Sequence, residues 1–445
     1  MHNQKKLKIT NKKKFKNSLH VTLKKKKNNI LLSKCIWEIK KCLSEKKLSK
    51  NNFLILSGFT FVFIFIFIFA ITGPLKSLFL KHNTLSEEYV LVWYSSTSQI
   101  DKLNSQIIVN TPPILKDKNN PINGNSISEE KFNELANKKV YGVIINNHPD
   151  ARPQYGLSLA DMVMEVLAEG GITRYVALFY ENEPEKIGPV RSLRRYMCDF
   201  LAEFDSPVML HEGWATFNSS NKVYVREVDA QADVNQFGYK SMQSPGSRYR
   251  DLEKAAKSGY VHSLYTSYAL IDSEFDRSAP ILGWETESNI EELAWKYDDL
   301  YKDRGNGGKI SINFLSFADA ISASGFEYNK LSNSYDRTIL GTNDIDLVNN
   351  QRISPKNVVI EWHDFRIAND GYARVIIDMI GGNQVQIYRD GKVFSGTWKK
   401  TSRMARTRYY DNEGKEIPLN RGQIWKVVAV KQGNAELSNV SYQEN

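Results

Sequence analysis

A run of 19 residues without a single charge, from Phe53 to Ile71, constrains this chain more than any other feature of its sequence. As a helix that rises 1.5 Å per residue, the run would be about 28 Å long, which matches the hydrocarbon core of a bilayer. A cleavable signal peptide has a shorter apolar region and a short basic start, whereas residues 1–52 precede this run. We therefore expect an uncleaved transmembrane helix within residues 51–75, with the lipid bilayer contacting Phe53–Ile71.

The distribution of charge predicts the orientation of this helix. Residues 1–50 contain 17 lysines, no arginine and only two acids, so they carry +15 against a formal net charge of +10 and leave −5 for the rest of the chain. Because Lys-rich flanks remain in the cytoplasm, we expect a cytoplasmic tail at 1–50 and an extracytoplasmic location for everything after Pro74. The predicted location is thus the plasma membrane, with a single pass. The folded part is mildly acidic and would gain little from phosphate neutralisation, which argues against nucleic acid as a partner.

The first folded region is expected to be an α/β domain at 139–295, because strand-like and helix-like patterns alternate there. Residues 76–138, which precede it, are rich in Asn, Ser, Lys and Pro, a composition typical of an extracytoplasmic stalk. Gly170-Gly171, which follows the first of the two expected helices, should end that helix. In order, the elements are a strand from Val140 (VYGVIINN), a helix that is capped by Ser158 and carries the apolar positions Met162, Val163, Val166 and Leu167, a strand over Ile172–Tyr180 and a helix over Ser192–Phe204.

The second folded region has a different pattern. From about Lys309 onward, short apolar runs such as KISINFL, NVVIEWHDF and QIWKVVAV are separated by Gly, Asn and Asp. This pattern predicts a mainly antiparallel β domain of α+β type at 305–432. Asp390-Gly391, between QVQIYR and KVFSG, is a strong signal for a two-residue hairpin. The boundary between the two domains is expected within residues 285–308.

Acidic and basic residues of the first domain are placed against local electrostatics. Three acids are spaced by four, so on the predicted helix they would form one stripe of mutually repelling charges. Three arginines crowd the start of the second predicted helix, the end at which the macrodipole disfavours cations. The acids are Asp161, Glu165 and Glu169, and the arginines are Arg191, Arg194 and Arg195.

Three interpretations of this pattern stay open. In the first, the arginines and the acidic stripe neutralise each other. In the second, N–H groups at the helix start and arginine forks form a site for phosphate or carboxylate. In the third, Asp161 and Glu165 hold Mg²⁺ as a cofactor beside a phosphate, although no spacing motif supports this. The candidate ligands of the anion site are His148, Asp150, Arg152, Arg174, Arg191, Ser192, Arg194 and Arg195.

Three histidines of the folded region, His148, His211 and His262, are candidate bases or metal ligands. No HExxH, CxxC or Gly-x-Ser-x-Gly motif accompanies them, and a lone histidine is more often structural. His148-Pro149-Asp150 is the best placed of these candidates, because it directly follows a predicted strand, where the ligand sites of α/β folds lie.

These segments resemble the YerB-like lipoproteins of Gram-positive bacteria, which are built from two domains of unknown function. The resemblance extends from Tyr141 to Val430 and implies an extracytoplasmic, surface-attached protein with an α/β first domain and a β-rich second domain. It rests on VIINNHPDARPQYGLSLADMVMEVLAEGGITRY, IGPVRSLRRY, HSLYTS, NVVIEW, GKVFSGTWKK and IPLNRGQIWKVV.

The chain departs from the pattern of this family at two places. Members of the family generally carry a lipid-modified Cys after a signal peptide, whereas Cys35 precedes the apolar run and cannot be such an acceptor. The family pattern Pro-His-Asn is replaced here by Val261-His262-Ser263, which weakens any role that the family would assign to His262.

Two functions are compatible with these features. In the first, the arginine region binds an anionic wall polymer, a lipid head group or an envelope protein. In the second, the chain is a phosphoryl or glycopolymer transferase that is similar to the LytR-CpsA-Psr ligases in arrangement only. Asp161 or Glu165 would then hold Mg²⁺, the arginines would clamp pyrophosphate, and His148 or Asp150 would act as the base. The sequence therefore leaves open whether the protein is an enzyme.

Overall fold

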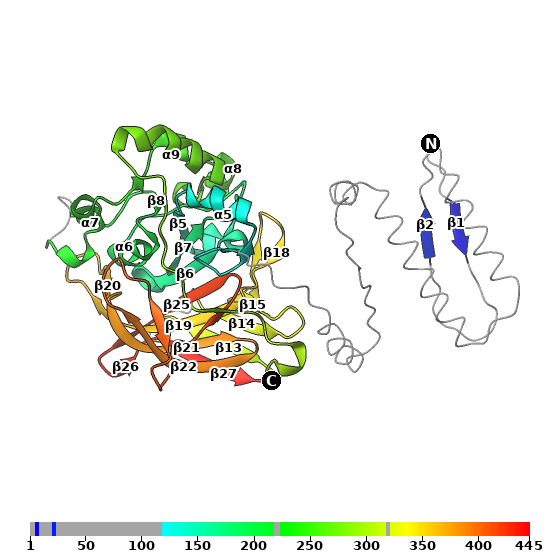
Figure 1. Cartoon of the computed structure of the whole chain (residues 1–445). Coiled ribbons are helices and arrows are strands. Elements are labelled where there is room, and N and C mark those ends of the chain that lie inside the picture. Colours follow the sequence, from blue (N-terminus) through cyan, green and yellow to red (C-terminus); the bar gives the residue numbers. More distant parts are fainter. Residues whose placement is uncertain (1–4, 9–19, 24–117, 218–222, 317–320) are drawn as a thin grey trace, which may run out of the picture. The chain divides into compact units, whose positions relative to one another are not determined.

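The computed structural model describes residues 5–8, 20–23, 118–217, 223–316 and 321–445 (Figure 1). The chain divides into two compact units, Met1–Trp93 and Tyr94–Asn445. The predicted membrane helix at Phe53–Ile71 lies outside the described residues, and no helix within them is long and apolar enough to cross a membrane. In the first unit, β1 (Lys5–Lys8) and β2 (His20–Leu23) form an antiparallel pair.

The α/β part of the second unit is built on a mixed sheet covered by helices (Figure 1). β7 lies between β6 and β5 and is antiparallel to both, whereas β8 runs parallel to β5 and β9 parallel to β8. The strands are β5 (Tyr141–Asn146), β6 (Met162–Leu167), β7 (Thr173–Phe179), β8 (Val208–Leu210) and β9 (Ser241–Met242). The helices are α5 (Glu129–Ala136), α6 (Arg195–Leu201), α7 (Ala230–Phe237), α8 (Leu252–Ser258) and α9 (Tyr268–Leu282).

The helix predicted between Ser158 and Gly170 is wrong, because its apolar positions belong to strand β6, Met162–Leu167. β6 pairs with β7 on one side and with β25 on the other, and all six of its residues are buried. Both faces of the strand are therefore covered, which explains why its sequence is almost continuously apolar. Such a run has the same composition in a buried strand and in a buried helix. Ser158 lies within a 3₁₀ turn, Leu157–Leu159, and caps no α-helix. The helical acidic stripe therefore does not exist.

The second predicted helix begins three residues later than expected. α6 begins at Arg195, and Arg194 precedes it in extended conformation. Leu193 forms a bridge with Trp214, so residues 191–194 are held alongside the segment that follows β8. The strand expected over Ile172–Tyr180 is confirmed as β7.

Residues 118–138, which the composition assigned to the stalk, belong to the folded unit. They contain β3 (Lys118–Asn119), β4 (Ser126–Ile127) and α5. Ile122 and Leu135 are buried in the core. The segment was not recognised because its few apolar residues pack against strands that are distant in sequence.

The C-terminal half is mainly antiparallel, as predicted. One five-stranded antiparallel sheet has the order β16-β15-β14-β13-β27. These strands are β13 (Gly308–Asn313), β14 (Ser324–Asn329), β15 (Ser334–Ile339), β16 (Thr342–Asn343) and β27 (Asn439–Glu444). A longer sheet contains β19 (Asn357–Ile367), β20 (Val375–Ile377), β21 (Gly381–Arg389), β22 (Lys392–Lys400), β23 (Arg408–Tyr410), β25 (Ile424–Gln432) and β26 (Ala435–Glu436).

Short strand pairs are β10 (Tyr249–Arg250) with β11 (Leu264–Tyr265), β12 (Trp295–Lys296) with β24 (Leu419–Asn420), and β17 (Ile345–Asp346) with β18 (Gln351–Arg352).

One twelve-stranded sheet connects the two halves of the unit. β25 runs parallel to β19 on one side and parallel to β6 on the other, so it joins strands of both predicted domains (Figure 1). The fully buried Arg337 of β15 reinforces this junction, because its Nη2 lies 2.9 Å from Oε2 of Glu165 on β6. The domain boundary expected within 285–308 stays a prediction.

The hairpin expected at Asp390-Gly391 is confirmed. β21 and β22 pair up to Arg389 and Lys392, and both turn residues have positive φ angles of 52° and 66°. Type I′ turns require this conformation at both central positions, and Asp-Gly satisfies the requirement at little cost.

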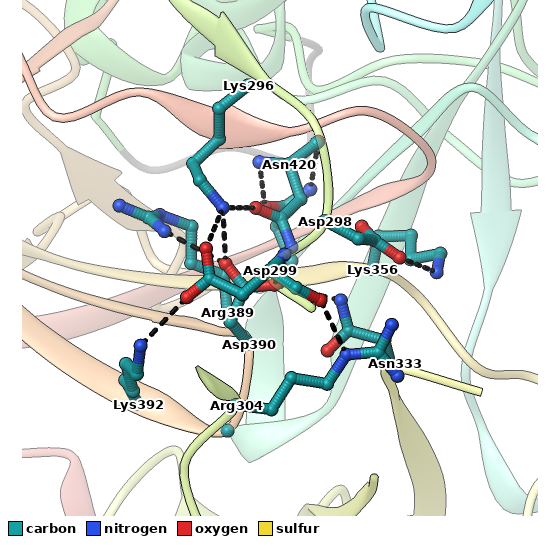
Figure 2. Close-up of polar contacts among 12 residues, drawn as sticks. Lys296, Asp298, Asp299, Arg304, Asn333, Lys356, Arg389, Asp390, Lys392 and Asn420 are labelled. Carbon is teal, nitrogen blue, oxygen red and sulfur yellow. Dashed lines mark hydrogen bonds and ion pairs between the residues drawn. The ribbon is translucent and has the colours of Figure 1, made fainter. Parts of the chain in front are cut away.

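The turn is held by a polar cluster around one fully hydrogen-bonded carboxylate, which we call the Asp390 cluster (Figure 2). The buried carboxylate of Asp390 accepts hydrogen bonds from Lys296 Nζ at 2.7 Å, Asn333 Nδ2 at 2.8 Å and Asn420 Nδ2 at 2.6 Å. Burial acts to raise the pKa of Asp390, but these donors outweigh it and hold that pKa below its ordinary value. The cluster comprises Lys296, Asp299, Asn333, Arg389, Asp390, Lys392 and Asn420.

Candidate functional site

Most of the polar residues selected from the sequence gather where β5 ends. Asn146 is the last residue of β5 and pairs in register with Arg174, the second residue of β7. The backbone N–H of Arg191 donates to Ile144 of β5, and the carbonyl of Arg191 accepts from Glu212, shortly after β8. Three stretches of chain that are distant in sequence thus place their polar side chains at the same end of the sheet.

Two of the arginines share one carboxylate. Arg194 forms a bidentate pair with Glu169, with Nε 2.6 Å from Oε1 and Nη2 2.8 Å from Oε2. Arg174 lies 3.4 Å from the same carboxylate and donates a further hydrogen bond to the carbonyl of Ser192 at 2.6 Å. Although burial acts to raise it, the pKa of Glu169 is lowered to about 2 by Arg194 and Arg174. The neutralising interpretation therefore holds for these residues, with two cations to one acid.

Arg191 differs from its neighbours because its guanidinium has no partner among the residues that the structure describes. The side chain is partly buried, and it makes no hydrogen bond or ion pair with any residue that the structure describes. Burial lowers its pKa, and the nearby charge of Arg194 lowers it further. Glu212, which is close by, is paired with Arg248 at 2.7 Å. A cation of this kind is poised to bind an anion that enters from solution.

Two histidines of this region stack on each other, the charge of Arg191 acts on one of them, and sequence reasoning had not paired them. His148 follows β5, His262 ends the 3₁₀ turn Tyr260–His262, and their rings stack with centroids 4.6 Å apart. Burial, together with the neighbouring His148 and Arg191, lowers the pKa of His262, so its imidazole is neutral at pH 7. Asp150 completes the group, with its Oδ2 3.4 Å from Nδ1 of His148.

Asn146 is a residue of this site that the sequence analysis missed. Its Oδ1 accepts the backbone N–H of His148 at 3.0 Å, and its Nδ2 lies 3.0 Å from Nδ1 of His262. A single amide thereby positions both imidazoles. The only available signal was the Asn-Asn pair between an apolar strand and His148.

Arg152 and Arg195 do not contribute an open cation to the site. Arg152 donates to both the side chain and the backbone carbonyl of Asn147, each at 2.9 Å, and to the carbonyl of Ile321 at 2.7 Å. It therefore braces the loop after β5. Arg195 points elsewhere, with Nε 3.1 Å from Asp233, beside a cavity of about 380 Å³.

The two carboxylates proposed as Mg²⁺ ligands are fully buried and already bonded. Asp161 accepts hydrogen bonds from the amides of Asn120 at 2.7 Å and Asn123 at 2.8 Å and from the backbone N–H of Tyr180 at 2.8 Å. Glu165 accepts from Arg337 at 2.9 Å. Neither carboxylate lines an open cleft opposite Arg191 or Arg194.

The folded unit is similar to two family models, a curated protein and a solved structure. The family model described as "Protein of unknown function (DUF3048) N-terminal domain" matches residues 127–281, and that of the corresponding C-terminal domain matches residues 312–425. A curated relative, "Putative lipoprotein YerB" of Bacillus subtilis (strain 168), is 28% identical over 305 residues, which cover 67% of this chain and 82% of the relative. The crystal structure of the YerB protein from Bacillus subtilis shares the fold, with a TM-score of 0.59 at 24% identity, over 73% of this chain and 99% of that one. The residues of the site all lie within the N-terminal match.

Proposed function

Since this chain belongs to the YerB-like family, whose two domains are of unknown function, we propose that it is a membrane-anchored extracytoplasmic protein of the bacterial cell envelope that binds an anionic ligand where β5 ends. The similarity to a protein described as a lipoprotein supports the envelope location. The apolar run Phe53–Ile71 supports attachment by a membrane helix.

The unpartnered guanidinium of Arg191 is the observation that carries the binding proposal. Arg174 and Arg194 have only Glu169 between them, so the local balance is positive even before Arg191 is counted. Burying part of an unpaired cation costs free energy, and an arginine fork regains it most fully from a planar carboxylate or a phosphoryl group. The ligand is therefore an anion with several acceptor oxygens, carried by a wall polymer, a lipid head group or an envelope protein.

We do not extend the proposal to a Mg²⁺-dependent transferase. Asp161 and Glu165, which that mechanism requires as metal ligands, are both fully buried. Their oxygens accept hydrogen bonds from N–H donors instead of facing a cleft. No arrangement of the described residues favours phosphoryl transfer over simple binding.

Thermal unfolding of the purified full-length protein with and without pyrophosphate tests the proposal. A ligand that binds only the native state raises its stability by about 2.7 kcal/mol at a concentration of 100 times Kd. Pyrophosphate should raise the midpoint of the wild type and of Arg366→Ala, a control variant that loses an exposed arginine of β19. It should have little effect on Arg191→Ala. A wild-type midpoint that ignores millimolar pyrophosphate would refute the proposal.

A further inference from the structure

The hydrogen bonds around the two stacked histidines fix their tautomers. The backbone N–H of Asp150 donates to Nδ1 of His148 at 3.2 Å, which makes this nitrogen an acceptor and places the ring proton on Nε2. A backbone N–H cannot reverse its role. The tautomer of His148 therefore follows from the fold of the loop after β5.

The same reasoning applies to His262 through Asn146. Because Oδ1 of Asn146 accepts the backbone N–H of His148, its Nδ2 is the group that faces Nδ1 of His262. Nδ1 of His262 is then an acceptor as well, and its proton also resides on Nε2. Neither Nε2 forms a hydrogen bond with another residue in the described part of the chain. Two stacked rings thus each keep an unused N–H donor, and the charge of Arg191 acts on one of them.

This arrangement distinguishes between two kinds of ligand. The candidate ligand atoms of His148, Asp150 and His262 lie within 4.8 Å of one another, a spacing that could suit a divalent metal ion. A metal, however, needs a nitrogen lone pair, and both Nδ1 lone pairs already accept hydrogen bonds while both Nε2 atoms carry protons. In metal sites, by contrast, the nitrogen that does not bind the metal normally donates its proton to a carbonyl or carboxylate. The hydrogen bonding here is that of an anion site.

We propose that His148 and His262 present two Nε2–H donors to a terminal phosphoryl group whose charge is met by Arg191, and that they do not hold a metal ion. The proposal rests on the anion-binding function proposed above and specifies its ligand class. A terminal phosphoryl group has three non-bridging oxygens for these three donors, whereas a phosphodiester has only two and one negative charge. The site therefore prefers monoesters and pyrophosphate to diesters.

The proposal also predicts how binding depends on pH. The groups that act on His262 are His148, Arg191, Asp150 and Lys254, and burial is the largest influence lowering its pKa. Because the hydrogen bonds at Nδ1 place a proton on Nε2 of each ring, donation to the ligand does not require a second proton on the ring. A phosphomonoester becomes a dianion above a pKa of about 6, so affinity should be as high at pH 8 as at pH 6.5.

Calorimetric titration of the full-length protein with methyl phosphate, dimethyl phosphate and Zn²⁺ tests the ligand class. Glutamine keeps an N–H donor near the position of Nε2, whereas leucine removes it. His262→Gln should retain methyl phosphate binding within a few-fold, and His262→Leu should lose roughly 10- to 100-fold, as expected for one hydrogen bond to a charged group. His148→Gln and His148→Leu, at a more exposed position, repeat the comparison should His262→Leu fail to fold. Vesicles with phosphatidate compete with methyl phosphate if the natural ligand is a lipid and do not if it is soluble, and either outcome is consistent with a phosphoryl site.

The ¹⁵N spectra of the imidazoles provide a readout that needs no ligand. Both His148 and His262 should show the Nε2–H tautomer at pH 7.5. The inference would be overturned by an Nδ1–H tautomer, by tight Zn²⁺ binding, or by equal loss of anion affinity in His262→Gln and His262→Leu, even if the wild type binds phosphate. Failure of the wild type to bind any anion would instead refute the proposed function and leave the tautomers as a structural result.

Discussion

The Asp390 cluster and the site at the end of β5 both collect charged side chains, but they differ in how fully those charges are satisfied. Asp390 is completely buried and accepts from amide, ammonium and backbone donors on all sides (Figure 2). Arg191 is only partly buried and has no partner among the described residues. A carboxylate whose oxygens all accept hydrogen bonds positions a turn, whereas a cation without a partner retains capacity for a ligand. The Asp390 cluster therefore fits a structural role, and the site where β5 ends fits the binding role proposed above.

Asp390→Ala should have the largest effect on stability. Removing this carboxylate leaves the buried Arg389 without an ion-pair partner among the described residues, whereas Lys296 keeps Asp299. Breaking a buried pair in this way costs about 3–5 kcal/mol. Chemical denaturation of the full-length protein should show this loss, and Asp378→Ala, which removes an exposed pair with Arg366, should cost no more than about 1 kcal/mol. Similar costs for the two variants would contradict the assignment of the Asp390 cluster as structural.

The same carboxylate predicts a pH dependence of stability. The pKa of Asp390 is lower in the folded protein than in the unfolded chain, although its burial acts in the opposite direction. Its contribution is therefore fully present above the unfolded pKa of about 3.9 and is lost as the pH falls further toward the folded value. Between pH 5 and pH 3 the wild type should lose more stability than Asp390→Asn. Parallel curves for the two proteins would show that Asp390 does not titrate in this way.

Glu169→Gln should affect stability and binding in opposite directions. The substitution leaves Arg174 and Arg194 without their shared carboxylate, and loss of these charge-assisted hydrogen bonds costs about 1–3 kcal/mol. It also increases the positive charge near Arg191, so pyrophosphate should bind more tightly than to the wild type. Calorimetry together with unfolding measures both effects, and weaker pyrophosphate binding would contradict the electrostatic account.

Asp150→Asn should have the smallest effect. Asp150 is well exposed and lies 3.4 Å from Nδ1 of His148, where its negative charge opposes an incoming anion. Exposed charges interact by less than about 1 kcal/mol, so removal should strengthen anion binding by no more than about fivefold and leave stability unchanged. Loss of anion binding in this variant would indicate that Asp150 contacts the ligand through a metal ion, contrary to our proposal.

The two regions also show what could be predicted from the sequence. The hairpin at Asp390-Gly391 was predictable because the turn chemistry is local. The gathering of His148 and the arginines was predictable in outline, because each follows or precedes a recognisable element. The strand Met162–Leu167 was not, since a fully buried apolar run does not distinguish a strand from a helix. Long-range partners, such as Arg337 for Glu165 and His262 for His148, left no local signal at all.

The central claim is that the site where β5 ends binds a phosphoryl-like anion. A crystal structure of the full-length protein soaked with tungstate would test this claim most directly. Tungstate is a tetrahedral dianion whose position can be read from its anomalous signal. We expect it within hydrogen-bonding distance of the Arg191 guanidinium and of Nε2 of both His148 and His262, with no tungstate at the Asp390 cluster. Tungstate bound only at other surface arginines, with Arg191 unoccupied, would contradict the account.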